Sequence, residues 1–147
     1  MLMDKAIEIL IVEDNPSDAE LTIRTLEKNN LSNNILWLKD GEQALDFLKG
    51  RGEYEGRNVK SKPKVIFLDL KLPKIDGIEV VREIRSSTNT KQIPVVMMTS
   101  SQEQKDRLKG YENGVNSYVV KPLDFQEFTK AINDVGYYWL VLNKPPV

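Results

Sequence analysis

The 147-residue sequence contains neither cysteine nor histidine. The absence of cysteine excludes disulfides, thiolate metal sites and thiol catalysis, and it fits a reducing compartment. The absence of histidine removes the usual serine-type triad, histidine acid–base chemistry and most transition-metal sites. Any chemistry must therefore come from carboxylates, hydroxyls, lysine or a bound hard cation.

The sequence also lacks long apolar runs and an excess of charge of one sign. No stretch approaches the length of a membrane span, and the start has no signal-peptide apolar region. With 21 basic and 22 acidic residues, the net charge is -1, which gives no electrostatic reason to expect nucleic acid or an acidic membrane as a partner. We expect a cytoplasmic protein with one compact domain over residues 1–147 and no DNA-binding output domain.

Five short apolar runs recur along the chain, each followed by a segment with helical spacing. They are residues 7–12, 35–38, 65–68, 94–98 and 117–120. The runs are too short for helices and are rich in Val, Ile and Leu, which is typical of strands buried on both faces of a parallel sheet. The alternation predicts repeated βα units and an α/β fold.

Local signals mark several element ends. Asn15, directly before a proline, supplies a helix N-cap, and Asp124 with Glu127 matches the capping box of the last helix. Gly114 fits a left-handed helix C-terminus before the fifth strand. Residues 50–63 are rich in glycine and charge and have little periodicity, which predicts a long, mobile surface loop.

Polar side chains stand at the ends of four predicted strands. Glu13 and Asp14 follow the first strand and Asp69 follows the third. If these strands are neighbours at the switch point of a doubly wound sheet, the three carboxylates converge there. Thr99 and Lys121 end the fourth and fifth strands, where their hydroxyl and ammonium groups can bind phosphoryl oxygens.

Carboxylates packed together resist simultaneous ionisation, and a hard divalent cation relieves that repulsion. Magnesium suits such a site because it prefers oxygen ligands and is commonly held by one or two carboxylates plus a phosphate. The cation would also neutralise charge on an incoming phosphoryl group, which allows Asp69 to act as a nucleophile. The pattern therefore predicts magnesium-assisted phosphoryl transfer to an aspartate.

Four stretches make this pattern specific: Glu13-Asp14, Asp69 within Asp-Leu-Lys-Leu-Pro-Lys-Ile-Asp-Gly, Thr99-Ser100, and Tyr118-Val-Val-Lys121-Pro122. Over essentially the whole chain they resemble the receiver domains of two-component response regulators. The resemblance implies a flavodoxin-like (βα)5 doubly wound fold whose five parallel strands lie in the order 2-1-3-4-5.

The same resemblance implies roles for the residues of the site. Asp69 becomes the phosphoacceptor. Mg²⁺ is held by Asp14, Asp69 and the backbone carbonyl of Lys71, with Glu13 acting through water. Phosphoryl contacts fall to Thr99 and Lys121, and Thr99 with Tyr118 forms a conformational switch. The family also implies a cis peptide bond between Lys121 and Pro122.

The end of the sequence narrows the resemblance. Residues 125–128 (Phe-Gln-Glu-Phe) and 138–140 (Tyr-Trp-Leu) are similar to the single-domain regulators that serve bacterial phytochrome histidine kinases. This implies a histidine kinase as partner, with a phytochrome as the candidate, and a downstream protein target. Two residues depart from the pattern: Gly136 interrupts the last helix, and Lys71 replaces a smaller polar residue.

The preferred function is a phosphorylation-controlled interaction module, which is not an enzyme beyond catalysing its own phosphorylation and dephosphorylation. A flavodoxin-like electron carrier is one alternative, but the negative charge of Glu13 and Asp14 would repel a cofactor phosphate. An aspartate-nucleophile phosphatase is another, and it would need a second aspartate where Lys71 stands.

Apolar residues of the last predicted helix recur at intervals of three and four and define one core-facing stripe: Phe125, Phe128, Ile132, Val135, Trp139 and Leu142. Further apolar residues lie off that stripe: Tyr137, Tyr138, Leu140 and Val141. Exposed apolar patches often mark association sites. We therefore expect this end of the chain to form a homodimer or partner interface.

Overall fold

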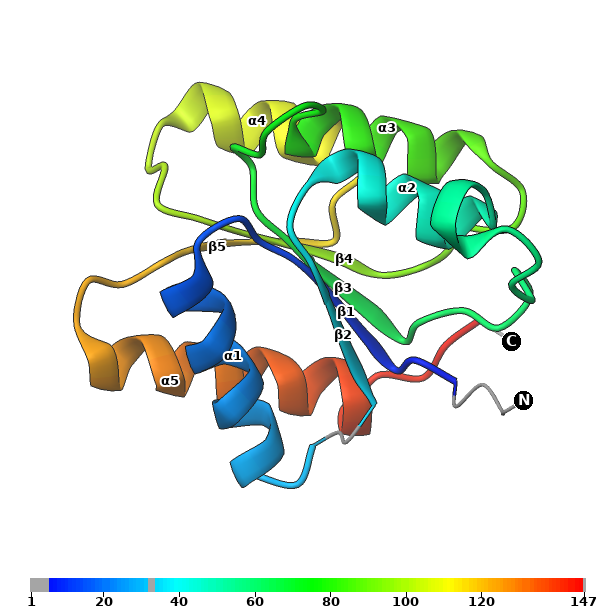
Figure 1. Ribbon diagram of the computed structural model, residues 1–147. Helices are drawn as coiled ribbons and strands as arrows, with labels where there is room; N and C mark the ends of the chain where they lie inside the picture. Colours follow the sequence, from blue (N-terminus) through cyan, green and yellow to red (C-terminus); the bar gives the residue numbers. More distant parts are fainter. Residues whose placement is uncertain (1–5, 32–33, 147) are drawn as a thin grey trace.

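The computed structural model describes residues 6–31 and 34–146. Strands and helices alternate as the sequence predicts (Figure 1). Their order is β1 (Ile9–Val12), α1 (Pro16–Lys28), β2 (Ile35–Leu38), α2 (Gly41–Lys49), the 3-10 turn η1 (Gly52–Tyr54), β3 (Val65–Leu68), α3 (Gly77–Ser86), β4 (Val95–Thr99), α4 (Gln104–Glu112), β5 (Ser117–Val120), α5 (Phe125–Tyr137) and the π-helical turn η2 (Tyr138–Leu142).

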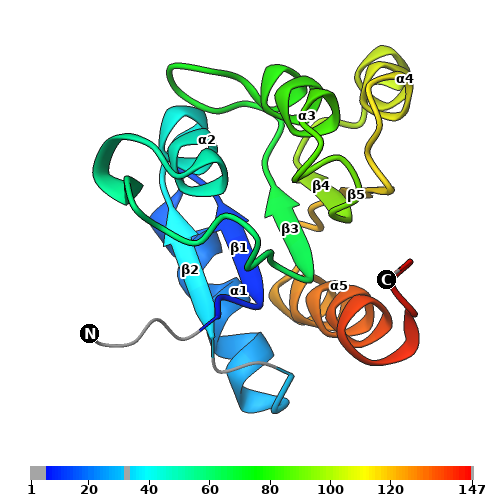
Figure 2. The ribbon, with the colours of Figure 1, turned by 90° about the vertical axis from the view of Figure 1, so that its right-hand side faces the viewer.

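The described strands form a five-stranded parallel sheet in the order β2-β1-β3-β4-β5. This confirms the predicted flavodoxin-like topology. Helices α1 and α5 cover one face, and α2, α3 and α4 cover the other (Figure 2). Within the described ranges, no helix is long and apolar enough to cross a membrane.

Side chains of β1 and β3 alternate between two apolar clusters, one on each face of the sheet. Leu10 and Val12 join the cluster under α2 and α3, whereas Ile9 and Ile11 join the cluster under α1 and α5. Every residue of these two strands is buried, as expected of inner strands in a parallel sheet. The polar residues that follow them are consequently held on a rigid support.

The predicted helix ends are confirmed. The Asn15 side chain accepts a hydrogen bond from the Asp18 N–H at 3.1 Å, and Asp124 accepts one from the Glu127 N–H at 3.0 Å. Gly114 has a φ of 105°, a conformation that favours glycine. The strand bounds differ slightly from the prediction, because β1 begins at residue 9 and β4 includes residue 99.

The predicted stripe of the last helix is correct only in its middle. Phe128 and Ile132 are buried, and Val135 and Trp139 pack against the same cluster. The ends of the stripe are wrong: Phe125 and Leu142 are exposed, and Leu140 packs inward instead. The physical reason at the C-terminal end is the wider π-helical turn of residues 138–142, which changes the phase of the side chains.

Gly136 allows α1 and α5 to approach closely. A Cβ atom on this residue would lie 2.7 Å from Leu26 Cδ2 and 3.1 Å from Leu31 Cδ1. Helix α5 continues through Gly136 to residue 137, so the glycine does not break the helix. Glycine lowers the helix propensity at this position by about 1 kcal/mol, but it permits the close contact between α1 and α5.

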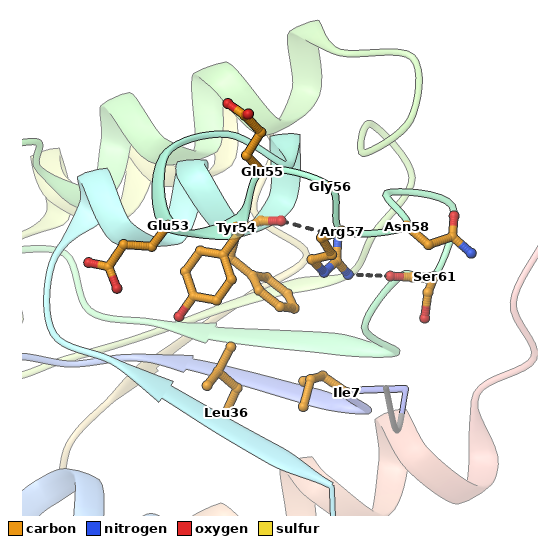
Figure 3. Close-up of a pocket in the computed structure, with 10 residues that line it drawn as sticks. Ile7, Leu36, Glu53, Tyr54, Glu55, Gly56, Arg57, Asn58 and Ser61 are labelled. Carbon is orange, nitrogen blue, oxygen red and sulfur yellow. Dashed lines mark hydrogen bonds between the residues drawn. The ribbon is translucent and has the colours of Figure 1, made fainter. Parts of the chain in front are cut away.

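Residues 50–63 form the predicted loop, and part of it packs against helix α2 through Phe47. The Tyr54 ring meets Phe47 edge-on at 5.2 Å, and the Arg57 guanidinium lies 3.8 Å from the centre of the Phe47 ring. A hollow of about 640 Å³ remains between this loop, Ile7 just before β1, and Leu36 of β2 (Figure 3). It lies at the amino ends of β1 and β2, away from the polar strand ends.

Candidate functional site

Three carboxylates converge at the carboxyl ends of β1 and β3. The two strands pair directly, with Val12 opposite Leu68, and the backbone N–H of Asp69 donates to Val12 O at 3.0 Å. This register places Glu13 and Asp14 beside Asp69, and one carboxylate oxygen from each lies within 4.8 Å of the others. The structure thus brings together the acidic residues that the sequence predicted.

Lys121 reaches this cluster from β5 across the end of β4. Its backbone N–H donates to Thr99 O at 2.7 Å, and its side chain is 11% exposed. The ammonium Nζ donates to Glu13 Oε1 at 2.6 Å and to Asp69 Oδ2 at 3.4 Å. Its position agrees with the prediction that a lysine at this strand end faces the acidic site.

Burial and charge shape the protonation of these groups. Burial and the negative charge of Asp69 raise the pKa of Glu13 to about 7, against the opposing hydrogen bond and charge of Lys121. Burial alone would lower the pKa of Lys121, but its hydrogen bond to Glu13 and the charges of Asp69 and Glu13 outweigh burial and raise it. Lys121 is therefore charged, and the cluster has a deficit of positive charge.

This deficit and the donor chemistry fit a hard divalent cation. Glu13, Asp14 and Asp69 all offer carboxylate oxygens, the ligands that Mg²⁺ prefers. Asp14 is exposed, whereas Glu13 is buried, so the cluster lies open to solvent on one side. A small cation with retained waters suits such a site better than a cation that needs a closed protein cage.

Asp18 is a third carboxylate partner of Lys121 that the sequence analysis missed. Its Oδ2 accepts a hydrogen bond from Lys121 Nζ at 3.0 Å, and its side chain is 28% exposed. In the sequence it is one acidic residue in the first turn of a helix, where aspartate is common for local electrostatic reasons. Only the placement of Lys121 reveals its second role.

A chain of hydrogen bonds links Thr99 to Tyr118 through the loop after β4. The Ser101 N–H donates to Thr99 Oγ1 at 3.2 Å, and the Tyr118 hydroxyl donates to Ser101 O at 3.1 Å. Thr99 is buried, and burial raises the pKa of the half-buried Tyr118. Ser101, which sequence reasoning did not single out, connects the two predicted switch residues.

The loop between β3 and α3 carries Lys71, whose side chain is exposed. The loop is closed by a hydrogen bond from the Gly77 N–H to Leu70 O at 2.7 Å. A Cβ atom on Gly77 would lie 2.4 Å from the carbonyl oxygen of Asp69, so only glycine allows this approach. The start of α3 thereby fixes the backbone at Asp69.

The prediction of a cis bond between Lys121 and Pro122 is wrong. The described residues contain no cis peptide bond, so this bond is trans. The lysine does not need a cis turn to face the site, because its side chain already reaches Glu13 and Asp69.

The sequence profile of the response regulator receiver domain matches residues 9–133. The chain belongs to this family. It is a receiver domain of two-component signalling, a family of phosphoacceptors that work with histidine kinases and bind a divalent cation at the acidic site. Neither the electron carrier nor the phosphatase gains any support from this match.

Individual receiver proteins are similar over nearly the whole chain. The Probable methanogenesis regulatory protein FilR2 of Methanothrix harundinacea is 41% identical, with 94% of this chain and 86% of that protein covered. The bacteriophytochrome response regulator RtBRR has a TM-score of 0.75 and is 52% identical, over 97% of this chain and 85% of that chain.

Two further solved structures resemble the chain more closely in shape. The Mn²⁺-bound form of response regulator Rcp1 has a TM-score of 0.87 and 35% identity, over 96% of this chain and 99% of that one. The phosphorylated cyanobacterial phytochrome response regulator RcpA has a TM-score of 0.88 and 31% identity, over 97% of this chain and 100% of that one. Single-domain and phytochrome-linked regulators are thus among the relatives, as the end of the sequence indicated.

Proposed function

We propose that Asp69 is the residue that accepts the phosphoryl group in this receiver domain. The observation that carries the proposal is the position of Lys121, whose ammonium group lies between Asp69 and Glu13 at the open end of the sheet. An ammonium at this place can bind an oxygen of a phosphoryl group on Asp69. The phosphorylated relative RcpA has the same overall fold.

In the proposed reaction, a carboxylate oxygen of Asp69 forms a bond to the phosphorus of the donor. The bond between phosphorus and the leaving atom of the donor breaks, and the leaving group keeps the electron pair. The Lys121 ammonium and the Thr99 hydroxyl donate hydrogen bonds to phosphoryl oxygens. A bound divalent cation supplies positive charge that neutralises the phosphoryl oxygens.

The test is phosphate incorporation from an acyl phosphate in the presence of Mg²⁺, measured by intact-protein mass spectrometry. The wild type should gain one phosphoryl group, and Asp69→Asn should gain none. Asp134→Asn is the matched control, because Asp134 is an exposed aspartate paired with Lys130 on α5. Labelling of the Asp69→Asn variant to the wild-type level would exclude Asp69 as the acceptor.

We also propose Mg²⁺ as the cation, bound directly by Asp14, Asp69 and the Lys71 carbonyl and through water by Glu13. The convergence of the three carboxylates supports this proposal, as does the Mn²⁺-bound form of the relative Rcp1. Because Mg²⁺ would bind the folded state only, millimolar Mg²⁺ should raise the melting temperature. Asp14→Ala should abolish the rise, and an equal rise in both proteins would contradict the site.

The proposed output is a change of the surface formed by α4, β5 and α5. The hydrogen-bonded chain from Thr99 through Ser101 to Tyr118 supports it, because movement of Thr99 toward a phosphoryl group would disturb the loop that holds the Tyr118 hydroxyl. The Thr99→Ala variant should still accept phosphate but lose the shift of the Tyr118 ring signals in NMR spectra. Retention of that shift would show that Thr99 is not the link.

For the kinase we propose a phytochrome histidine kinase. The support comes from the names and similarity of the relatives RcpA and RtBRR. Phosphotransfer should be faster from an autophosphorylated bacterial phytochrome than from an unrelated histidine kinase at equal concentration. Equal rates from both kinases would leave the domain as a receiver without this preference.

A homodimer through the end of the chain is the last part of the proposal. Tyr137, Tyr138 and Val141 are about half exposed. Trp139 and Leu140 of the same segment line a hollow of about 390 Å³ together with Pro63 and Pro94. Removing residues 137–147 would also remove core contacts of Trp139 and Leu140, so surface substitutions give the better test. In sedimentation, a Tyr138→Ser, Val141→Ser variant should be monomeric where the wild type is dimeric.

A further inference from the structure

The Lys121 ammonium has three carboxylate partners, and one of them stands apart from the other two. Glu13 and Asp69 belong to the cluster whose oxygens lie within 4.8 Å of one another. Asp18 does not belong to it, yet its Oδ2 accepts a hydrogen bond from Lys121 Nζ at 3.0 Å, shorter than the 3.4 Å contact with Asp69. Asp18 is therefore bound to the lysine without being part of the proposed cation site.

The backbone of Asp18 is held at both of its polar groups. Its N–H donates to the Asn15 side chain at 3.1 Å, and its carbonyl accepts from the Thr22 hydroxyl at 2.8 Å. Both contacts lie within or next to the first turns of α1, which packs on α5 and the sheet. The Asp18 carboxylate is thus presented to Lys121 from a fixed support, in contrast to a side chain on a free loop.

Phosphoryl transfer changes the other two contacts of the lysine. One oxygen of Asp69 becomes bonded to phosphorus, and Glu13 turns toward the cation as a partner through water in the proposed arrangement. An ammonium group has three N–H donors and a long, flexible stem. If the ammonium loses both cluster partners at once, its direction must come from a partner that lies outside the cluster.

We propose that Asp18 is a positioning residue that holds the Lys121 ammonium over Asp69 during phosphoryl transfer. The proposal rests on the proposed role of Asp69. Asp18 occupies one N–H of Lys121 and leaves the other two for phosphoryl oxygens, so it directs the lysine without displacing the phosphoryl group. The reaction remains the same: the Asp69 oxygen bonds to phosphorus while the leaving group of an acyl phosphate departs with its electron pair.

The test compares the wild type with Asp18→Asn, Asp18→Glu and Glu20→Gln. Asn keeps the size of the side chain and removes its charge, and Glu restores the carboxylate. Glu20 lies on the same helix and pairs only with the exposed Arg24 in the described structure, so Glu20→Gln makes the same change of net charge away from the site. Acetyl phosphate serves as the donor, in saturating Mg²⁺, and labelling at Asp69 is followed by mass spectrometry.

We expect the labelling rate of Asp18→Asn at saturating donor to fall about tenfold, which corresponds to about 1.4 kcal/mol. The donor concentration for half-maximal rate and the Mg²⁺ dissociation constant should stay within about twofold of wild type, because a positioning group acts on the transition state and not on binding. Asp18→Glu should recover most of the rate. Glu20→Gln should match the wild type.

Several results would overturn the inference and leave the proposed function standing. They are an unchanged or higher rate for Asp18→Asn, an equal loss in Glu20→Gln, no recovery in Asp18→Glu, or a loss of Mg²⁺ affinity that accounts for the slower rate. A wild type that gains no phosphoryl group at Asp69 would instead overturn the proposed function and this inference together.

Discussion

Replacing Lys121 with methionine removes the positive charge of the site and leaves most of its bulk. In the wild type this ammonium binds Glu13, Asp18 and Asp69. Without it, the carboxylates repel one another in a setting where the Glu13 side chain is only 9% exposed. The variant should therefore be less stable than the wild type when no divalent cation is present.

The structure sets the size of this loss. Breaking a fully buried ion pair by removing one partner costs about 3–5 kcal/mol. The Asp18 side chain is 28% exposed, and Glu13, whose pKa burial and Asp69 already raise to about 7, can take up a proton. Both facts reduce the loss to about 2 kcal/mol, which lowers the melting temperature of a chain of this size by about 4–8 °C.

Magnesium should raise the stability of the Lys121→Met variant by more than it raises the stability of the wild type. Lys121 and the cation neutralise the same carboxylates of Glu13 and Asp69, so the cation binds more tightly where the ammonium is missing. Urea denaturation and thermal scans at mildly alkaline pH, with EDTA or with millimolar Mg²⁺, measure both effects. A Lys121→Met variant that matches the wild type in EDTA and gains no more stability from Mg²⁺ would refute the reasoning.

Two further predictions concern stability. Gly77→Ala should cost about 2 kcal/mol, because its Cβ would lie 2.4 Å from the Asp69 carbonyl oxygen; Gly110→Ala, whose nearest contact would be 3.4 Å, is the control and should be neutral or stabilising in urea denaturation. The hydrogen bond and charge of Lys49 lower the pKa of Glu83 below its ordinary 4.5. The ion pair of Lys49 and Glu83 therefore stabilises the folded state above this pH, and its contribution is lost as the pH falls. Glu83→Gln should accordingly have a lower free energy of unfolding than the wild type at neutral pH, and the two free energies should become equal in acid.

The central part of the fold and site could be predicted because it depends on buried strands. The apolar runs of β1 and β3 are buried on both faces, so the first polar residues after them had to lie at the sheet edge. Parallel pairing then brings Glu13 and Asp69 together, and Lys121 follows from the same rule on β5. In each case a local pattern in the sequence decides the position of a side chain in space.

Other features depend on contacts between distant segments and have no local signal. Asp18 has the sequence setting of an ordinary first-turn aspartate, and its bond to Lys121 spans 103 positions. Gly136 looks like a helix breaker until the closeness of Leu26 is known. The π-helical turn after residue 137 changes which apolar residues face the core, and a regular helical period cannot predict it.

The charge balance of the site explains why the contact between Asp18 and Lys121 matters to the proposed function. The Lys121 ammonium binds three carboxylates, those of Glu13, Asp18 and Asp69, and a fourth carboxylate, that of Asp14, lies beside Glu13 and Asp69. The proposed divalent cation would remove most of the excess negative charge, and the proposed phosphoryl group on Asp69 would add some back. Cation and phosphoryl group should consequently favour each other's binding. Within that exchange of charge Lys121 has to change partners, and the carboxylate of Asp18 is the one that the proposed cation does not use.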